Sequence, residues 1–180
     1  MNRLSNKVAV ITGGNSGIGL ATAERFVAEG AQVVLFGRNA GTLAAATAKL
    51  GSQASAVIGD VTSAADLARL FDSVRSAHGR IDVLFVNAGI AEFLPIEQVT
   101  ADHYDRQFDI NVRGAFHTIR GALPLIGAGG SIVLNTSVVS HVGLPRPFDR
   151  ARDGVGIGEG ACAPVREDPE FALARGARVV

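Results

Sequence analysis

The glycine-rich segment 12–19 constrains the fold of this chain more than any other feature of its sequence. It reads Thr12-Gly13-Gly14-Asn15-Ser16-Gly17-Ile18-Gly19 and joins the apolar run 8–11 to residues 17–29, where apolar side chains recur at helical spacing. An uninterrupted apolar run is typical of a strand that is covered on both faces of a parallel sheet. Glycines at such a strand-to-helix turn let the backbone approach a pyrophosphate, although they also serve tight turns for steric reasons alone. The segment therefore predicts a phosphate-binding turn in an α/β fold.

The same strand and helix unit recurs along the chain. Apolar periodicity predicts further strands at 32–36, 54–58, 81–86 and 131–134, and helices at 40–50, 64–77 and about 103–123. Strands that alternate with helices of this length imply right-handed crossovers and a parallel sheet with helices on both faces. We expect a doubly wound α/β fold with about five strands in the order 3-2-1-4-5.

The composition changes sharply after Pro145. Residues 146–180 contain six Arg but no Lys, Ser, Thr, Asn, Gln, His or Tyr, and glycine stands at every second position from 154 to 160. Glycine at that density disfavours both helix and strand. We therefore expect one domain at 1–145 and an irregular tail at 146–180.

Charge and cysteine content restrict the class of partner. Seventeen Lys and Arg residues balance seventeen Asp and Glu residues, which disfavours nucleic acid and anionic membranes as partners. Cys162 is the single cysteine, and the N-terminal residues lack the apolar stretch of a signal peptide. We expect a cytoplasmic protein with a small-molecule partner, without a membrane span and without a metal site.

Four motifs together resemble the short-chain dehydrogenase/reductase family of NAD(P)-dependent oxidoreductases. They are the G-x-x-x-G-x-G spacing, Asp60-Val61, Asn87-Ala88-Gly89 and Asn111-Val112-Arg113-Gly114, and the resemblance covers about residues 5–145. It implies a Rossmann-type fold, a nicotinamide cofactor and, typically, a homo-oligomer. The cofactor-binding residues that it implies are Gly13, Asn15, Ser16, Gly17, Ile18, Gly19, Arg38, Asn39, Asp60, Val61, Asn87, Ala88 and Gly89.

The resemblance also implies individual roles, and each has a structural alternative. Asp60 and Val61 would contact the adenine, residues 87–89 would line the adenosine and nicotinamide side, and Asn111 would hold a water in a catalytic proton relay. Alternatively, Asp60 caps the following helix, Asn87 ties two strands together, and Asn111 bonds helix backbone at a kink.

The end of the second strand indicates which cofactor is preferred. NAD-selective sites place Asp or Glu there to bond the ribose hydroxyls, and such a carboxylate repels a 2′-phosphate. Here the position holds Gly37, and Arg38 offers a planar cation that suits phosphate. The sequence favours NADP(H) over NAD(H), with a solvated loop charge as the alternative for Arg38.

The family's catalytic tyrosine and lysine are missing. Ser137 matches the serine that bonds the substrate oxygen, with a turn-forming serine at the strand end as the alternative. The expected tyrosine and lysine positions hold Arg150 and Gly154. Tyr104 is the sole tyrosine, and the two lysines both precede residue 50. Reading the codons of residues 153–171 one base later permits a segment that resembles the helix after the catalytic lysine. The region from about 146 to 172 is thus interpreted as frameshifted, although this shift does not restore the tyrosine.

The sequence accordingly leaves three hypotheses about function open. The first is an NADP(H)-dependent oxidoreductase that transfers a hydride between nicotinamide and a secondary alcohol or ketone, with Asn111 and Ser137 as catalytic residues. The second is a catalytically inactive dinucleotide-binding fragment, because no acid matches the missing tyrosine. The third is a misfolded or aggregation-prone product without a function. For the chain as written, we expect no measurable ketone reduction.

Overall fold

Five parallel strands form one sheet in the order β3-β2-β1-β4-β5. The structure is a computed structural model and describes residues 2–137. The strands are β1 (Val8–Thr12), β2 (Gln32–Gly37), β3 (Ala54–Ile58), β4 (Ile81–Val86) and β5 (Ile126–Leu134). The predicted doubly wound sheet and its strand order are confirmed. The predicted irregular tail at 146–180 lies outside the described residues.

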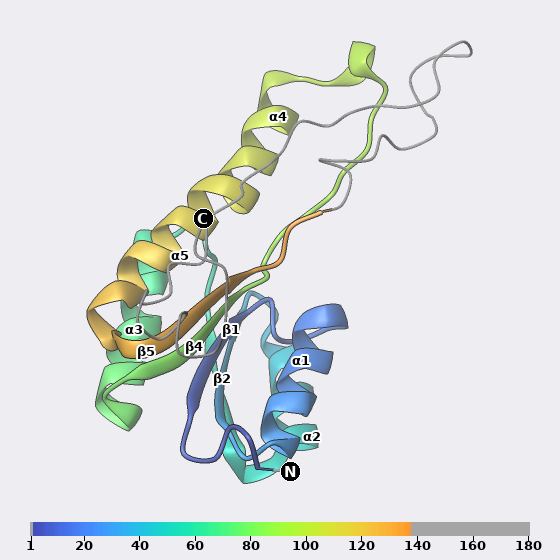
Figure 1. Ribbon diagram of the computed structural model, residues 1–180. Coiled ribbons are helices and arrows are strands. Elements are labelled where there is room, and N and C mark those ends of the chain that lie inside the picture. Colours follow the sequence, from blue (N-terminus) through green and yellow to red (C-terminus); the bar gives the residue numbers. More distant parts are fainter. Residues whose placement is uncertain (1, 138–180) are drawn as a thin grey trace, which may run out of the picture.

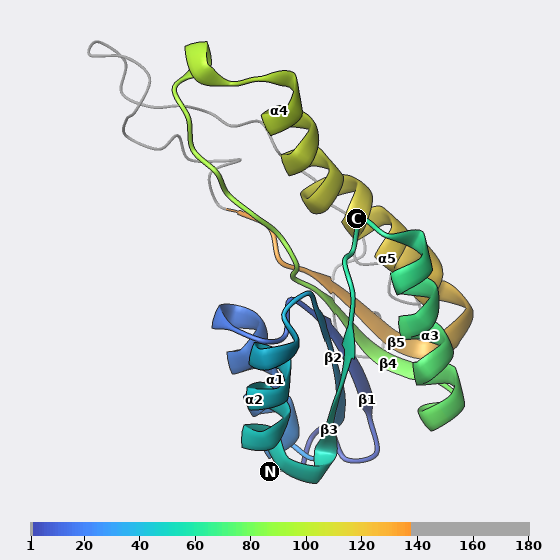
Figure 2. The same cartoon turned by 180° about the vertical axis from the view of Figure 1, so that it is seen from behind.

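Helices cover both faces of the sheet (Figures 1 and 2). One face carries α1 (Gly17–Ala28) and α2 (Ala40–Leu50), and the other carries α3 (Ala64–His78) and α5 (Ala115–Ala122). Helix α4 (Ala101–Phe108) extends beyond the sheet. Short 3-10 turns lie at Gly51–Gln53, Ile96–Gln98 and Leu123–Leu125. None of the helices among residues 2–137 is long and apolar enough to cross a membrane.

The central strand β1 explains why residues 8–11 are apolar throughout. All five of its residues are buried, and successive side chains point to opposite faces. Val10 packs in the cluster that includes α3 residues such as Leu70, whereas Ala9 and Ile11 pack in the cluster that includes Leu43 of α2. From β1 the chain first adds β2 and β3 on one side and then crosses to β4 and β5 on the other side. At such a switch point a crevice opens at the carboxyl ends of the strands.

Two elements differ from the sequence prediction. The helix expected at about 103–123 is α4 and α5 joined by a π-helical turn, Asp109–Gly114. Strand β5 begins at Ile126 rather than Ser131, because an irregularity in its pairing with β4 accommodates the glycine-rich stretch 127–130. Gly129 has a φ of +80° there, which few other residues adopt. The first part of β5 was not predicted because its glycines show no alternation of apolar and polar side chains.

Candidate functional site

A cleft of about 310 Å³ opens at the carboxyl ends of the strands. Ten of the thirteen residues predicted to bind cofactor line it, and Gly17, Ile18 and Gly19 do not. Its lining residues are Gly13, Asn15, Ser16, Phe36, Gly37, Arg38, Asn39, Gly59, Asp60, Val61, Asn87, Ala88, Gly89, Ile90 and Ile110. The segments that follow β1, β2, β3 and β4 meet at this edge of the sheet. They thus bring together motifs that are far apart in the sequence.

The glycine turn forms one wall of the cleft. Gly13 has a φ of +65° and donates its N–H to the carbonyl oxygen of Phe36 at 2.8 Å. A Cβ on Gly19 would lie 2.2 Å from the carbonyl oxygen of Gly13, so only glycine fits there. Within residues 2–137, the side chain of Ser16 makes no capping hydrogen bond to α1. The first N–H groups of this helix therefore have no side-chain cap from Ser16 and suit an anionic ligand.

Asn87 ties the ends of β1 and β4 together, as its structural alternative predicted. Its Nδ2 donates to the carbonyl oxygens of Thr12 at 3.1 Å and Gly13 at 3.2 Å. The buried Thr12 hydroxyl accepts from the backbone N–H groups of Asn87 and Ala88 at 3.0 and 3.1 Å. Asn135, which sequence reasoning missed, donates its Nδ2 to Asn87 Oδ1 at 2.8 Å. Asn135 lies directly after β5, as the predicted site residues lie after their strands, and this position could have identified it.

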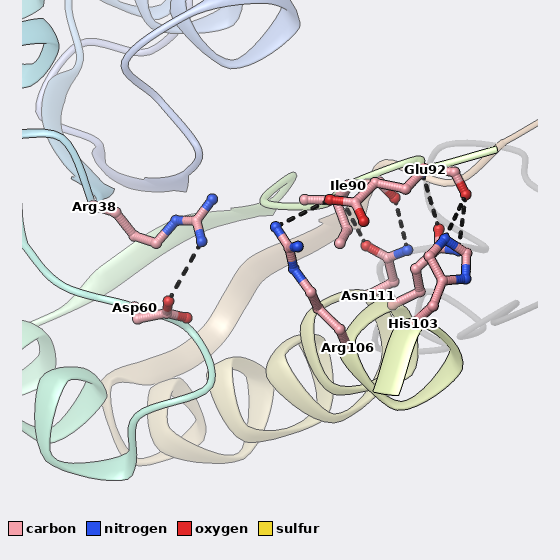
Figure 3. Close-up of polar contacts among 8 residues, drawn as sticks. Arg38, Asp60, Ile90, Glu92, His103, Arg106 and Asn111 are labelled. Carbon is pink, nitrogen blue, oxygen red and sulfur yellow. Dashed lines mark hydrogen bonds and ion pairs between the residues drawn. The ribbon is translucent and has the colours of Figure 1, made fainter. Parts of the chain in front are cut away.

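Arg38 and Asp60 form the ionisable part of the cleft. Arg38 Nη1 lies 3.7 Å from Asp60 Oδ2, and the two side chains are 60% and 32% exposed (Figure 3). Among the described residues that line the cleft, they are the only ionisable ones. Sequence reasoning singled out both residues but did not pair them. The same end of the cleft holds Asn39, whose Oδ1 caps α2 by accepting from Thr42 N at 2.9 Å.

Asp60 does not cap α3. Ser63 caps this helix, accepting from Asp66 N at 3.2 Å, so the capping alternative for Asp60 is wrong. Instead, Asp60 Oδ1 accepts from the N–H and hydroxyl of Thr62 at 2.9 and 2.8 Å. Asp60 N donates to Asp66 Oδ2 at 2.9 Å. This N–H is the main cause that lowers the pKa of Asp66, followed by a hydrogen bond from Arg69, while burial acts in the opposite direction.

Asn111 fixes the segment after β4. Its Oδ1 accepts from Ile90 N and its Nδ2 donates to Ile90 O, both at 2.9 Å (Figure 3). It lies in the π-helical turn, and its partner is Ile90 rather than the backbone of its own helix, so the alternative of a bond to helix backbone is wrong. One and two turns earlier, Gln107 and His103 hydrogen-bond the backbone of Glu92. The water-binding role of Asn111 stays a prediction.

Residues 7–147 match the family model described as "short chain dehydrogenase". The chain belongs to the short-chain dehydrogenase family. The resemblance inferred from the four motifs is therefore confirmed, together with the assignment to a family of oxidoreductases.

Relatives within the short-chain dehydrogenases are similar over the same region. "Oxidoreductase asL5" of Sarocladium schorii is 46% identical over 147 residues, which cover 81% of this chain and 59% of that protein. "Galactitol 2-dehydrogenase" of Agrobacterium fabrum is 38% identical over 134 residues, covering 73% and 52%. A solved short-chain dehydrogenase/reductase from Brucella melitensis, titled a glucose/ribitol dehydrogenase, superposes with a TM-score of 0.77 at 31% identity, covering 86% of this chain and 64% of that one. The chain thus spans a little over half of these curated relatives.

Neither Ser137 nor Tyr104 lines the cleft as the described residues form it, and the expected tyrosine and lysine positions, Arg150 and Gly154, lie outside those residues. Ser137, the predicted catalytic serine, is exposed just after β5 and is not among the lining residues. Tyr104 lies in α4 and stacks on Phe108 with ring centroids 4.3 Å apart. Phe36, Gly37, Gly59, Ile90 and Ile110 line the cleft without having been predicted to bind cofactor. Gly37, Gly59, Ile90 and Ile110 each lie next to a predicted residue along the chain, and Phe36 lies two residues before Arg38, which was the signal available for them.

Proposed function

We propose that the cleft binds NADP(H) and that the protein is an oxidoreductase for a secondary alcohol and its ketone. The observation that carries the cofactor choice is the end of β2, where Gly37 stands in place of an acid and the exposed Arg38 side chain follows. A carboxylate at position 37 would repel a 2′-phosphate, whereas a guanidinium binds one with paired, charge-assisted hydrogen bonds.

The remaining cleft residues fit a dinucleotide. A Cβ at Gly13 would meet Asn87 Nδ2 at 3.0 Å, and a Cβ at Gly59 would meet the Phe36 ring at 2.6 Å, so small residues keep the backbone close to the cleft. The α1 N-terminus would offer N–H donors to the pyrophosphate, and Asp60, which lines the cleft, would accept from an adenine amino group. When bound, the nicotinamide would supply or accept the hydride.

The relatives support the reaction class. Their names describe oxidoreductases, and that of the Agrobacterium relative gives a sugar alcohol as its substrate. We therefore assign residues 1–145 to a nucleotide-binding domain whose partner is a small alcohol or ketone. Asn111 and Ser137 are proposed as its catalytic residues.

Titration of the full chain with NADPH and NADH, followed by cofactor fluorescence, tests this proposal. We expect NADPH to bind at least about tenfold more tightly, since one charge-assisted bidentate contact contributes on the order of 1.5–3 kcal/mol. Arg38→Ala should remove this preference. Arg75→Ala, which removes a cation from the exposed side of α3, should keep it. Equal affinities in the unmodified chain, or an unchanged preference in Arg38→Ala, would overturn the proposal.

A further inference from the structure

Asn15 occupies the space beside Gly37 that any larger side chain would need. A Cβ built on Gly37 lies 2.7 Å from Asn15 Oδ1 and 3.4 Å from its Cγ, whereas its third-nearest atom, on Leu43, is 3.9 Å away. A contact of 2.7 Å between a carbon and an oxygen is well inside their van der Waals distance. A side chain at position 37 therefore requires Asn15 to move.

Asn15 is held in this place by a short chain of hydrogen bonds. Its Nδ2 donates to the hydroxyl oxygen of Thr42 at 2.9 Å, and that hydroxyl donates to the carbonyl oxygen of Asn39 at 3.2 Å. The N–H of Thr42 is in turn fixed by Asn39 Oδ1 at 2.9 Å. Because the amide nitrogen is used by Thr42, the amide oxygen is the atom that faces Gly37.

We propose that Asn15, positioned by Thr42, is a second determinant of nucleotide choice, acting by excluding an acidic side chain from position 37. This inference rests on the proposed function, because it concerns how the same cleft distinguishes a 2′-phosphate from a 2′-hydroxyl. An acid at position 37 would meet Asn15 through its Cβ and would also bring its negative charge towards the partly negative amide oxygen. With no acid at position 37, the charged side chain next to the end of β2 is that of Arg38.

The inference predicts that residues 15 and 37 are coupled. The test is a double-mutant cycle on the full chain with Asn15→Ala, Gly37→Asp and the combined variant. Calorimetric titration uses two probes that differ only in the 2′-phosphate, AMP for a free 2′-hydroxyl and adenosine 2′,5′-bisphosphate for the 2′-phosphate. Ser52→Asp in the Asn15→Ala background is the matched charge control, since Ser52 lies in the turn before β3 at the opposite end of the sheet from the cleft.

Gly37→Asp alone should weaken the binding of both probes, because the new side chain enters occupied space. In the Asn15→Ala background, the same substitution should strengthen AMP binding by about tenfold and reverse the preference for the 2′-phosphate. Thr42→Val removes the anchor while keeping Asn15, and should partly relieve the effect of Gly37→Asp. Thr47→Val, which removes a hydroxyl bonded only within α2, should not relieve it.

Thermal unfolding supplies a readout that needs no nucleotide. Gly37→Ala should lower the unfolding midpoint by about 2–4 °C in the unmodified chain, since the clashing atom is the end of the Asn15 side chain, and by less in the Asn15→Ala background. The inference is overturned if Gly37→Asp reverses the preference equally in both backgrounds, or if the Gly37→Ala shift is the same in both. Equal binding of the two probes by the unmodified chain would instead overturn the proposed NADP(H) preference, which keeps the two failures distinct.

Discussion

Arg38 and Asp60 form an ion pair at one end of the cleft, with Arg38 Nη1 3.7 Å from Asp60 Oδ2. The cation proposed to bind the 2′-phosphate is thus held by the carboxylate proposed to contact the adenine. Both side chains are partly exposed, and ion pairs of this kind contribute little free energy. A phosphate can therefore displace the carboxylate from Arg38, but it does so in competition with Asp60.

Asp60→Asn should increase the preference for NADPH over NADH by about two- to fivefold, the range expected for a partly exposed ion pair. The amide can still accept a hydrogen bond from the adenine, but it neither pairs with Arg38 nor repels the phosphate. Fluorescence titration of both cofactors measures the ratio. Asp72→Asn, on the exposed side of α3, is the control and should leave the ratio as it is. A lower ratio in Asp60→Asn would show that the carboxylate helps to position Arg38.

The sequence predicted that these lining residues meet because each of them lies just after a strand. The apolar runs locate the strands, parallel strands end at a common edge, and so Gly13, Arg38, Asp60 and Asn87 had to meet. The pairing of Arg38 with Asp60 depends on how two loops fold across β2 and β3. Periodicity carries no information on that geometry.

Gly19→Ala should lower the free energy of unfolding by about 1–3 kcal/mol, because its Cβ would lie 2.2 Å from the carbonyl oxygen of Gly13 and the backbone would have to shift. Gly41→Ala is the matched control within a helix. A Cβ there meets its nearest atom at 3.4 Å, so this variant should gain about 0.4–1 kcal/mol through reduced entropy of the unfolded chain. Urea unfolding measures both. Equal effects of the two substitutions would show that the turn tolerates a side chain.

Asn111→Leu should destabilise the fold by about 1–3 kcal/mol, the usual cost of leaving partly buried polar groups unpaired. Leucine has a similar volume but cannot hydrogen-bond the backbone N–H and C=O of Ile90. Arg113→Ala is a control in the same π-helical turn, since Arg113 forms an exposed ion pair with Asp109 and should matter little. Chemical denaturation compares them, and equal stabilities would mean that water replaces the Asn111 amide at Ile90.

The break in the helix around Asn111 was beyond sequence prediction for a physical reason. Apolar spacing at 103–123 is consistent with one continuous helix, and a π-helical turn changes that spacing by a single residue. Its position depends on the hydrogen bonds that Asn111 makes with Ile90, which is 21 residues earlier in the chain. A pattern within one segment cannot reveal such a distant partner.

Acid should destabilise the protein partly through Asp66. Hydrogen bonds, first from the N–H of Asp60 and then from Arg69, lower the pKa of Asp66 from its ordinary value of 3.8. A pKa that is lower in the folded state stabilises the fold above the ordinary value, and this stabilisation is lost as the pH falls through the lowered pKa. Asp66→Asn should therefore lose less stability than the unmodified chain between about pH 6 and about pH 3. Urea unfolding at both pH values measures this, and parallel losses would contradict it.

Proton transfer should limit turnover by this chain. Reducing a ketone creates alkoxide character that a positioned acid must neutralise, and such an acid contributes typically 10²- to 10⁴-fold. Ser137 can donate a hydrogen bond but is too weak an acid, and Arg150, at the expected tyrosine position, stays protonated.

The comparator is a chain with the reading frame of residues 146–172 restored and tyrosine and lysine at positions 150 and 154. NADPH consumption over a panel of ketones should be at least about 10²-fold slower for the unmodified chain. The lysine adds to this difference, because a group that holds the nicotinamide ribose also aims the hydride, and a misplacement of about 1 Å can cost roughly a hundredfold. Similar rates for the two chains would mean that another residue of this sequence delivers the proton.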